Sequence, residues 1–400
     1  MKIIAARLRT SQAASGMVSG VFLPFFAAWL AWRGLDAGQI GLLLSLSLVL
    51  RAFTGPASGI VADARDDRRG AMLVLYWAMF AGFAALPFAK DPALIFLCAV
   101  PAYVAFGSAT PLLESVSVRL SERYGFDYGR VRLWASSAFI AMNITAGLCV
   151  GRYGIHAVAP LLAATSVLCV ITTLALPAPA SLPRGALAPR LRATWNEARE
   201  LMRSGVFLVF LAASSFAQAS HAFYYAYGGL HWRTLGYSGP LIGILWPLGV
   251  FAEIALFSQA LRVLRVIGPT RLLWYGALGC VVRWTILAFD PPLPVVVLAQ
   301  FLHGATFAMA HLGAMFFILR AVPARLAATA QSLYFVCSAG LMMGIATYAA
   351  GLIYAVSGGR AYLLMSAMGV VAMALALLLA RQWQGGRIIH GAADEHSDAI

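Results

Sequence analysis

Charged residues are scarce in this sequence. Of its 400 residues 15 are acidic and 29 basic, so 11% carry a charge, whereas 61% are hydrophobic. A single soluble core cannot hide so large an apolar share in a chain of this length, and the composition therefore excludes an ordinary soluble protein. Lipid is the solvent that the composition predicts.

The motifs of several enzyme classes are also missing. There is no His-Glu-x-x-His metal pair, no nucleophile elbow and no phosphate-binding glycine loop. The five cysteines lie in different apolar segments, without the spacing of a metal or redox site: Cys98, Cys149, Cys169, Cys280 and Cys337. No polar stretch is long enough for a signalling domain. We therefore expect no enzyme, no metal site and no cofactor.

Apolar runs divide the chain into twelve segments. A bilayer core of about 30 Å needs about 20 helical residues for each crossing. Helices are expected because lipid leaves every backbone group to be paired within its own segment, and the runs lack the alternation of barrel strands. The segments are 11–32, 39–62, 71–89, 92–118, 131–150, 157–176, 206–228, 240–260, 272–289, 294–319, 327–353 and 361–380.

The two halves of the chain repeat a motif. Trp-Arg-Gly-Leu at 32–35 recurs as Trp-Arg-Thr-Leu at 232–235, and Ile-Gly-Leu-Leu at 40–43 recurs as Ile-Gly-Ile-Leu at 242–245. Parallel repeats of this kind occur in secondary transporters. We predict an all-α membrane protein of two six-helix bundles, with the bundles at 1–176 and 206–381, a proline- and arginine-rich cytoplasmic linker at 177–205, and a cytoplasmic tail at 382–400.

The net charge of +14 is a topology signal rather than a sign of nucleic-acid binding. With twelve crossings, most basic residues fall on the side of the N-terminus, and the links on the opposite side hold only Arg33, Lys90, Arg152, Arg233 and Arg360. The positive-inside rule then places both termini in the cytoplasm. The first apolar run is too long for a cleaved signal peptide and should remain as helix one.

Function is expected where lipid would reject a charge, because an ionised group at bilayer depth normally faces an internal cavity. The candidates are Arg51, Glu114, Arg132, Glu253, Arg283, His221, His303 and His311. Arg51 and Glu253 occupy equivalent places in the two halves, and a structural ion pair that joins the halves is the alternative reading for them. Glu114 and Arg132 flank a cytoplasmic link, so they could instead reach out to lipid headgroups.

Polar and aromatic stripes suggest a central cavity. On the fifth segment Arg132, Ser136, Phe139 and Asn143 are spaced 4, 3 and 4, and the seventh segment repeats this spacing with Ser214, Gln218, His221 and Tyr225. The tenth segment carries Gln300, His303, Phe307 and His311, and Trp246 shares a helical face with Glu253. For any single polar residue, a hydrogen bond between packed helices is the alternative.

The chain resembles a major facilitator superfamily permease, of the branch with lactose permease, nucleoside permeases and phenylpropionic acid permeases. The residues that carry the resemblance are Tyr-Gly-Arg-Val-Arg-Leu-Trp at 128–134, with Glu114 upstream. The resemblance implies that Glu114 and Arg132 bind substrate and that Arg283 and His303 take part in proton coupling. The chain departs from lactose permease at Thr306, where that protein has a carboxylate, and it lacks the lysine of helix eleven.

The resemblance also points to one residue of the second half and to one loop of the first half. Proton carriage would shift to Glu253, whose Trp-x-x-Gly-Val-x-x-Glu setting at 246–253 resembles phenylpropionate permeases. The superfamily loop between helices two and three is matched imperfectly by Gly59, Asp63, Arg68 and Arg69.

We therefore expect a proton-coupled symporter that imports a small organic solute by alternating access, as a monomer in the bacterial inner membrane. An aromatic carboxylate is favoured because guanidinium binds carboxylates in bidentate form. The alternatives are a symporter for a neutral sugar or nucleoside, a proton-coupled drug exporter, and, from another class, a membrane enzyme or sensor. The expected substrate-binding residues are Glu114, Arg132, Phe139, Asn143, Gln218, His221, Tyr225 and Trp246; the proton-coupling residues are Glu253, Arg283 and His303; and the interdomain or gating residues are Arg51, Asp63, Arg68 and Arg69.

Overall fold

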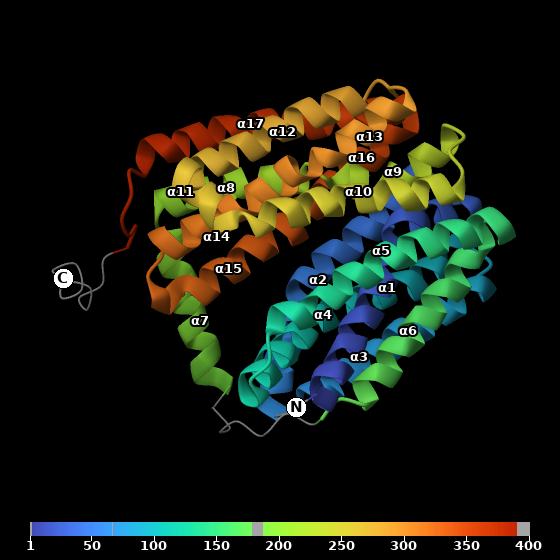
Figure 1. Ribbon diagram of the computed structural model, residues 1–400, viewed down its shortest axis with the longest axis horizontal. Helices are drawn as coiled ribbons and strands as arrows, with labels where there is room; N and C mark the ends of the chain where they lie inside the picture. Colours follow the sequence, from blue (N-terminus) through green and yellow to red (C-terminus); the bar gives the residue numbers. More distant parts are fainter. Residues whose placement is uncertain (1, 66, 178–186, 390–400) are drawn as a thin grey trace. The chain divides into compact units, whose positions relative to one another are not determined.

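The computed structural model describes residues 2–65, 67–177 and 187–389, and their regular structure is entirely helical (Figure 1). The first half contains α1 (Lys2–Trp32), α2 (Ala37–Arg65), α3 (Arg68–Ala85), α4 (Pro92–Tyr124), α5 (Tyr128–Tyr153) and α6 (Val158–Leu174). The remainder contains α7 (Leu187–Met202), α8 (Gly205–Ala219), α9 (Ala222–Thr234), α10 (Gly239–Ser258), α11 (Ala260–Ile267), α12 (Pro269–Leu287), α13 (Leu293–Phe301), α14 (Ala310–Ala321), α15 (Ala327–Phe335), α16 (Met343–Ser357) and α17 (Tyr362–Gln382). Of the expected linker, residues 178–186 lie outside the described residues, as do residues 390–400 of the expected tail.

Ten helical stretches are long and apolar enough to cross a membrane. One of them, Ala324–Gln382, is 59 residues long and contains two crossings in succession, and α12 adds another of 19 residues. The described residues therefore hold twelve transmembrane segments, which confirms the all-helical prediction. Two of these segments contain a π-helical turn, Gly304–Met309 between α13 and α14 and Val336–Met342 between α15 and α16.

The helices form two compact units. Unit 1 contains Met1–Leu187, Ala222–Val250 and Gly344–Ala361, and unit 2 contains Ala188–His221, Phe251–Met343 and Tyr362–Ile400. Unit 1 thus includes two segments from the second half of the chain. Both units are described below by themselves.

In unit 1 the central helix is α1, which packs against α5, α6 and α9. The contact with α9 is close because Gly229 has no side chain: a Cβ there would collide with the carbonyl oxygen of Pro24 in α1. Aromatic rings fill the interior beside α1, where Phe22 stacks on Phe26 and on Tyr103 with centroid distances of 4.6 and 4.1 Å. Apolar packing of this density positions the few polar groups that share the interior.

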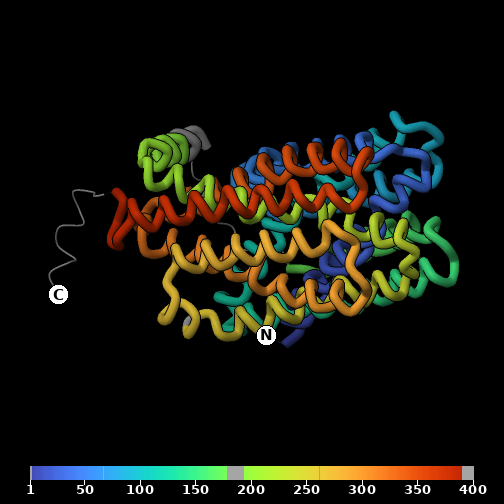
Figure 2. The backbone as a smooth tube through the Cα atoms, turned by 90° about the horizontal axis from the view of Figure 1, so that it is seen from above, coloured from blue at the N-terminus to red at the C-terminus, as the bar shows by residue number. Residues whose placement is uncertain are grey.

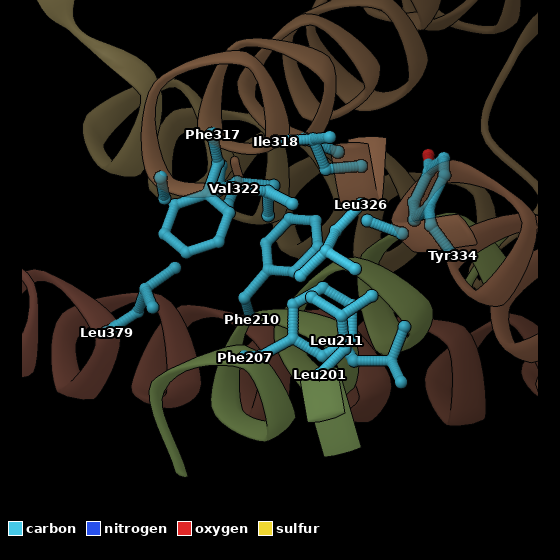
Figure 3. Close-up of a cluster of buried hydrophobic side chains, with 14 of the residues drawn as sticks. Leu201, Phe207, Phe210, Leu211, Phe317, Ile318, Val322, Leu326, Tyr334 and Leu379 are labelled. Atoms are coloured by element: carbon cyan, nitrogen blue, oxygen red, sulfur yellow. The ribbon is translucent and has the colours of Figure 1, made fainter. Parts of the chain in front are cut away.

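In unit 2 α12 and α17 pack along one another, as Figure 2 shows, and α8 packs against α17. One end of the unit is closed by a buried apolar cluster from α7, α8, α14, α15 and α17 (Figure 3). Phe210 and Phe317 stack there at 4.3 Å, and Leu201 of α7 is fully buried among them. Three hydrogen bonds to α7 strengthen this attachment, because Glu200 forms a bidentate ion pair with Arg325 and Glu197 accepts from the hydroxyl of Thr329.

Candidate functional site

The first polar cluster lies in unit 1 at the hairpin between α4 and α5. α4 ends at Gly125, which adopts a left-handed conformation with φ 66°, and Asp127 caps α5 by accepting from its first backbone N–H groups. This short connection sets the two helices side by side and antiparallel. Glu114 of α4 consequently meets Arg132 of α5.

The carboxylate of Glu114 is surrounded by donors. Its Oε1 lies 2.8 Å from Nε of Arg132, and its Oε2 accepts from the hydroxyl of Tyr128 and from Nε2 of Gln12 at 3.4 Å. Gln12 also donates to Ser117 at 3.1 Å. Within the described residues these contacts supply only donors, which suit an ionised carboxylate, since a carboxylic acid would need an acceptor for its own proton. The side chains of Arg132 and Glu114 are 46% and 28% exposed, so a solute can reach the pair.

The second polar cluster lies in unit 2 around Arg283 of α12, which is fully buried. Its Nη1 donates to Nδ1 of His303 at 2.9 Å and to the hydroxyl of Thr306 at 3.3 Å, and its Nη2 donates to Oε1 of Gln300 at 3.0 Å. The guanidinium also lies 4.5 Å from the ring centroid of Trp284. A charge buried this deeply in a membrane-spanning segment is costly and usually marks a functional position.

His221 of unit 2 joins this cluster through Thr306. Its Nδ1 faces the carbonyl oxygen of Gln218 at 3.0 Å, and its Nε2 faces the hydroxyl of Thr306, also at 3.0 Å. Because a carbonyl only accepts, we assign the ring proton to Nδ1, so that Nε2 accepts from the hydroxyl. Thr306 therefore accepts from Arg283 and donates to His221, and it links the two groups.

Glu253 of α10 completes the cluster. Its Oε2 lies 3.8 Å from Nε2 of His303, and its side chain is 23% exposed. The two helices approach closely here because position 304 is a glycine: a Cβ on Gly304 would lie 3.0 Å from the carbonyl oxygen of Ala252. Glu253, His303 and Arg283 thus form a chain of one carboxylate, one imidazole and one guanidinium.

Two further residues that are expected to bind substrate, Tyr225 and Trp246, belong to unit 1. Trp246 stacks there with Tyr224 at 4.5 Å and with Tyr225 at 6.2 Å. Trp246 is buried, and its indole Nε1 has no hydrogen-bond partner among the described residues. A buried indole N–H usually has a hydrogen-bond partner, so this donor beside a tyrosine ring is unusual.

The side chain of Asn143 bonds to the backbone of its own helix, α5, at Phe139. The Nδ2 of Asn143 donates to the carbonyl oxygen of Phe139 at 2.7 Å, and the side chain of Asn143 is fully buried. The hydrogen bonds and ring contacts described for these two residues do not connect them to Glu114 or Arg132.

Arg51 lies in unit 1 over the ring of Tyr103, with its guanidinium carbon 5.6 Å from the centroid. Its aliphatic part passes beside Gly107, where an added Cβ would lie 2.7 Å from Cδ of Arg51. This packing holds the guanidinium of Arg51 against the ring of Tyr103.

The loop between α2 and α3 is held by ionic contacts within unit 1. Arg68 is buried, forms an ion pair with Asp63 and donates to the hydroxyl of Ser115. Arg69 does not join that pair but donates to the carbonyl oxygens of Thr173 and Leu174 at the end of α6. The two neighbouring arginines thus attach α3 to different helices.

Several residues of both clusters were not predicted as site residues. Tyr128 and Gln12 are uncharged groups that donate to Glu114, and Thr306 and Gln300 are neutral groups that contact Arg283. Tyr128 stood in the motif that carries the family resemblance, and Gln300 stood in a polar stripe. The motif and the stripe were the sequence features that could have pointed to these two residues. The hydropathy of a single Gln or Thr does not indicate a functional position.

The chain resembles known proteins over nearly its whole length. Residues 16–364 match the MFS_1 like family. A probable 3-phenylpropionic acid transporter of Escherichia coli (strain K12) is 30% identical over 366 residues, which cover 89% of this chain and 93% of that protein. The maltose permease of Geobacillus stearothermophilus is 28% identical over 367 residues, which cover 91% of each chain.

Solved structures agree with this match. The nucleoside transporter NupG superposes with TM-scores of 0.85 and 0.80 in two structures, at 16% identity, over 95% of this chain and 100% of that one. The fold is therefore that of major facilitator transporters. The chain belongs to the MFS_1 like family, and it is a multi-pass membrane transporter rather than an enzyme.

Proposed function

We propose that this protein is a proton-coupled symporter that imports a small aromatic carboxylate, such as a phenylpropionate-like acid, by alternating access. It acts in the inner membrane of a bacterium, with both termini in the cytoplasm, and works as a monomer. The coupling ion is the proton, and no other cofactor takes part.

The observation that carries the proposal is the chain from Glu253 through His303 to Arg283 in unit 2. In the proposed cycle, a proton from the extracytoplasmic side binds the carboxylate of Glu253, which weakens its attraction to Nε2 of His303. Release of the same proton to the cytoplasm restores the charged carboxylate. Arg283 holds His303 in place through both steps, because its Nη1 already occupies Nδ1 of the ring.

The substrate class is inferred from charge. Arg132 is the half-exposed guanidinium of unit 1, and its charge is balanced by Glu114. A carboxylate that binds there adds one negative charge to the membrane interior, which is costly. Uptake of one proton with each carboxylate restores neutrality, so anion binding and proton coupling support each other. The name of the probable 3-phenylpropionic acid transporter agrees with this class.

The remaining expected residues receive supporting roles. Tyr225 and Trp246 would bind the aromatic body, with the indole N–H of Trp246 as a further donor. Gln218 and His221 contribute polar groups in unit 2, and Phe139 and Asn143 shape α5. The gating role falls to Arg51, Asp63, Arg68 and Arg69, whose contacts fix the loop and helix ends described above.

Flux driven by a pH gradient in proteoliposomes tests the proposal. The full-length protein is reconstituted, and uptake of 3-phenylpropionate and other aromatic acids is compared with uptake of sugars and nucleosides at equal concentration. We expect accumulation of the aromatic acid against its gradient only when the outside is more acidic, together with alkalinisation outside. Uptake that is indifferent to the pH gradient would refute proton coupling.

A second candidate is proton symport of a neutral sugar or nucleoside. The ion pair of Glu114 and Arg132 favours it, since an internally neutral pair offers donors and acceptors that match hydroxyl groups. The similarity to a maltose permease points the same way. In the same assay this candidate requires saturable sugar or nucleoside uptake that no aromatic acid inhibits.

A further inference from the structure

The ion pair between Glu114 and Arg132 uses only part of each group. The shortest approach between the two groups joins Oε1 of Glu114 to Nε of Arg132 at 2.8 Å, and the described residues show no hydrogen bond from an Nη atom of Arg132 to Glu114. A carboxylate beside an arginine usually takes two parallel N–H donors, because the two forks match. The single contact therefore needs a cause.

The cause lies at Oε2 of the same carboxylate. The hydroxyl of Tyr128 donates to Oε2, and the side-chain amide of Gln12 in α1 donates to the same oxygen at 3.4 Å. Oε2 is thereby held away from the second donor of the guanidinium.

This arrangement leaves donors on Arg132 for another anion. A guanidinium has five N–H groups, and the ion pair with Glu114 is closest at one of them, the N–H of Nε. The Arg132 side chain is 46% exposed, more than the 28% of Glu114, so the arginine is the more accessible member of the pair. A bidentate contact with Glu114 would instead occupy two parallel N–H donors of Arg132, and a second carboxylate needs such a pair of donors.

We propose that Tyr128 is a positioning residue of the substrate site: it keeps the Glu114–Arg132 pair monodentate and so reserves the Nη donors of Arg132 for the carboxylate of the substrate. Gln12 has the same role with a longer contact. Glu114 then orients Arg132 and does not bind the anion itself. The inference rests on the proposed function, since it assigns the carboxylate of that substrate to a particular edge of Arg132.

Binding measurements on two matched probes test this role. The probes are 3-phenylpropionate and its neutral amide, 3-phenylpropionamide, and their Kd values are measured by ligand-induced thermal shift on the purified full-length protein. In Tyr128→Phe the carboxylate of Glu114 can rotate onto Arg132, so we expect the Kd of 3-phenylpropionate to rise about tenfold, a factor that corresponds to about 1.4 kcal/mol. The Kd of the amide should change less than twofold, and in proteoliposomes KM should rise while kcat stays near the wild-type value.

The controls separate positioning from a general loss of structure. Tyr153→Phe alters an exposed tyrosine at the other end of α5 and should leave both Kd values unchanged. Gln12→Met should raise the Kd of the carboxylate in the same direction but less, and it serves as the test if Tyr128→Phe does not fold. An equal loss of affinity for both probes, or no loss for either, would overturn the inference. If the wild-type protein binds no aromatic carboxylate, the proposed function itself fails, and this result needs no variant.

Discussion

Arg283 determines which ring nitrogen of His303 carries the proton, because Nη1 of the guanidinium lies 2.9 Å from Nδ1 of the imidazole. A guanidinium can only donate, so Nδ1 must accept and the proton of the neutral ring belongs to Nε2. That Nε2 faces Oε2 of Glu253 at 3.8 Å. His303 therefore presents an N–H group to the carboxylate that we propose as the proton carrier, and a second proton on the ring would have to displace Arg283.

We predict that Glu253→Gln abolishes accumulation against a gradient while exchange of substrate across the membrane continues. Glutamine keeps the size of the side chain and can still accept from His303, but it cannot bind and release a proton at neutral pH. The measurement compares uphill uptake with counterflow in proteoliposomes. Glu122→Gln, at an exposed position of α4, is the matched control and should retain both activities. Undiminished uphill uptake by Glu253→Gln would remove this residue from the mechanism.

Thr306→Val should lower both thermal stability and transport. The variant keeps the shape of the side chain but leaves Arg283 and His221 without their shared hydroxyl in a buried place. A buried polar group that loses its partner costs about 1–3 kcal/mol, so the Tm of the purified protein should fall. Thr306→Ser restores the hydroxyl and should recover most of the Tm and of the uptake rate. Three proteins with the same Tm would show that the link through Thr306 is unimportant.

The helices could be predicted well because the bilayer imposes a length on apolar runs. The fourth segment was expected to begin at residue 92, and α4 does begin at Pro92, directly after the capping residue Asp91. Its end was expected at 118, but the helix continues to Tyr124. Hydropathy marks where the chain leaves the hydrocarbon, whereas a helix ends where its backbone is capped, here by Gly125.

The charged members of the candidate site could be predicted for a similar reason, since lipid tolerates few charges. In the structure Arg283 contacts His303, and Glu253 lies 3.8 Å from the other ring nitrogen of His303. Their role in proton coupling stays a prediction. Tyr128 and Thr306 could not be predicted as partners, because the identity of a neutral hydrogen-bond partner depends on the register between helices. No periodicity in a single sequence determines that register.

Gly229→Ala should destabilise the protein although alanine favours helices. A methyl group at this position would collide with the carbonyl oxygen of Pro24, so α1 and α9 would have to separate. Overpacking of this kind costs about 1–3 kcal/mol. Gly55→Ala is the matched control on α2, where an added Cβ meets no atom within 4 Å, and there the helix should gain about 0.5–1 kcal/mol. Thermal unfolding should therefore move in opposite directions for the two variants, and a higher Tm for Gly229→Ala would contradict the close packing.

The attachment of α7 to unit 2 should weaken in acid. Two hydrogen bonds from the Arg325 guanidinium hold the pKa of the Glu200 carboxyl below its usual range. Because the folded-state pKa is the lower one, the stabilisation is fully present above the ordinary pKa of glutamate and disappears as the pH falls through the lowered value. The protection factors of the α7 amides, which correct the exchange rates for their intrinsic dependence on pH, should thus be constant from neutral pH down to the ordinary glutamate range and decrease below it.

Glu200→Gln should remove this acid transition and speed exchange in α7 already at neutral pH. Leu201 remains buried in the apolar cluster, so α7 should loosen without detaching and α8 should keep its protection. Because the side chains of Glu200 and Arg325 are 37% and 51% exposed, salt should reproduce part of the effect in the wild-type protein by screening the pair. If α7 in Glu200→Gln still responded to acid as the wild type does, another group would have to hold the helix, and the carboxyl of Glu197 at Thr329 would be the next to change.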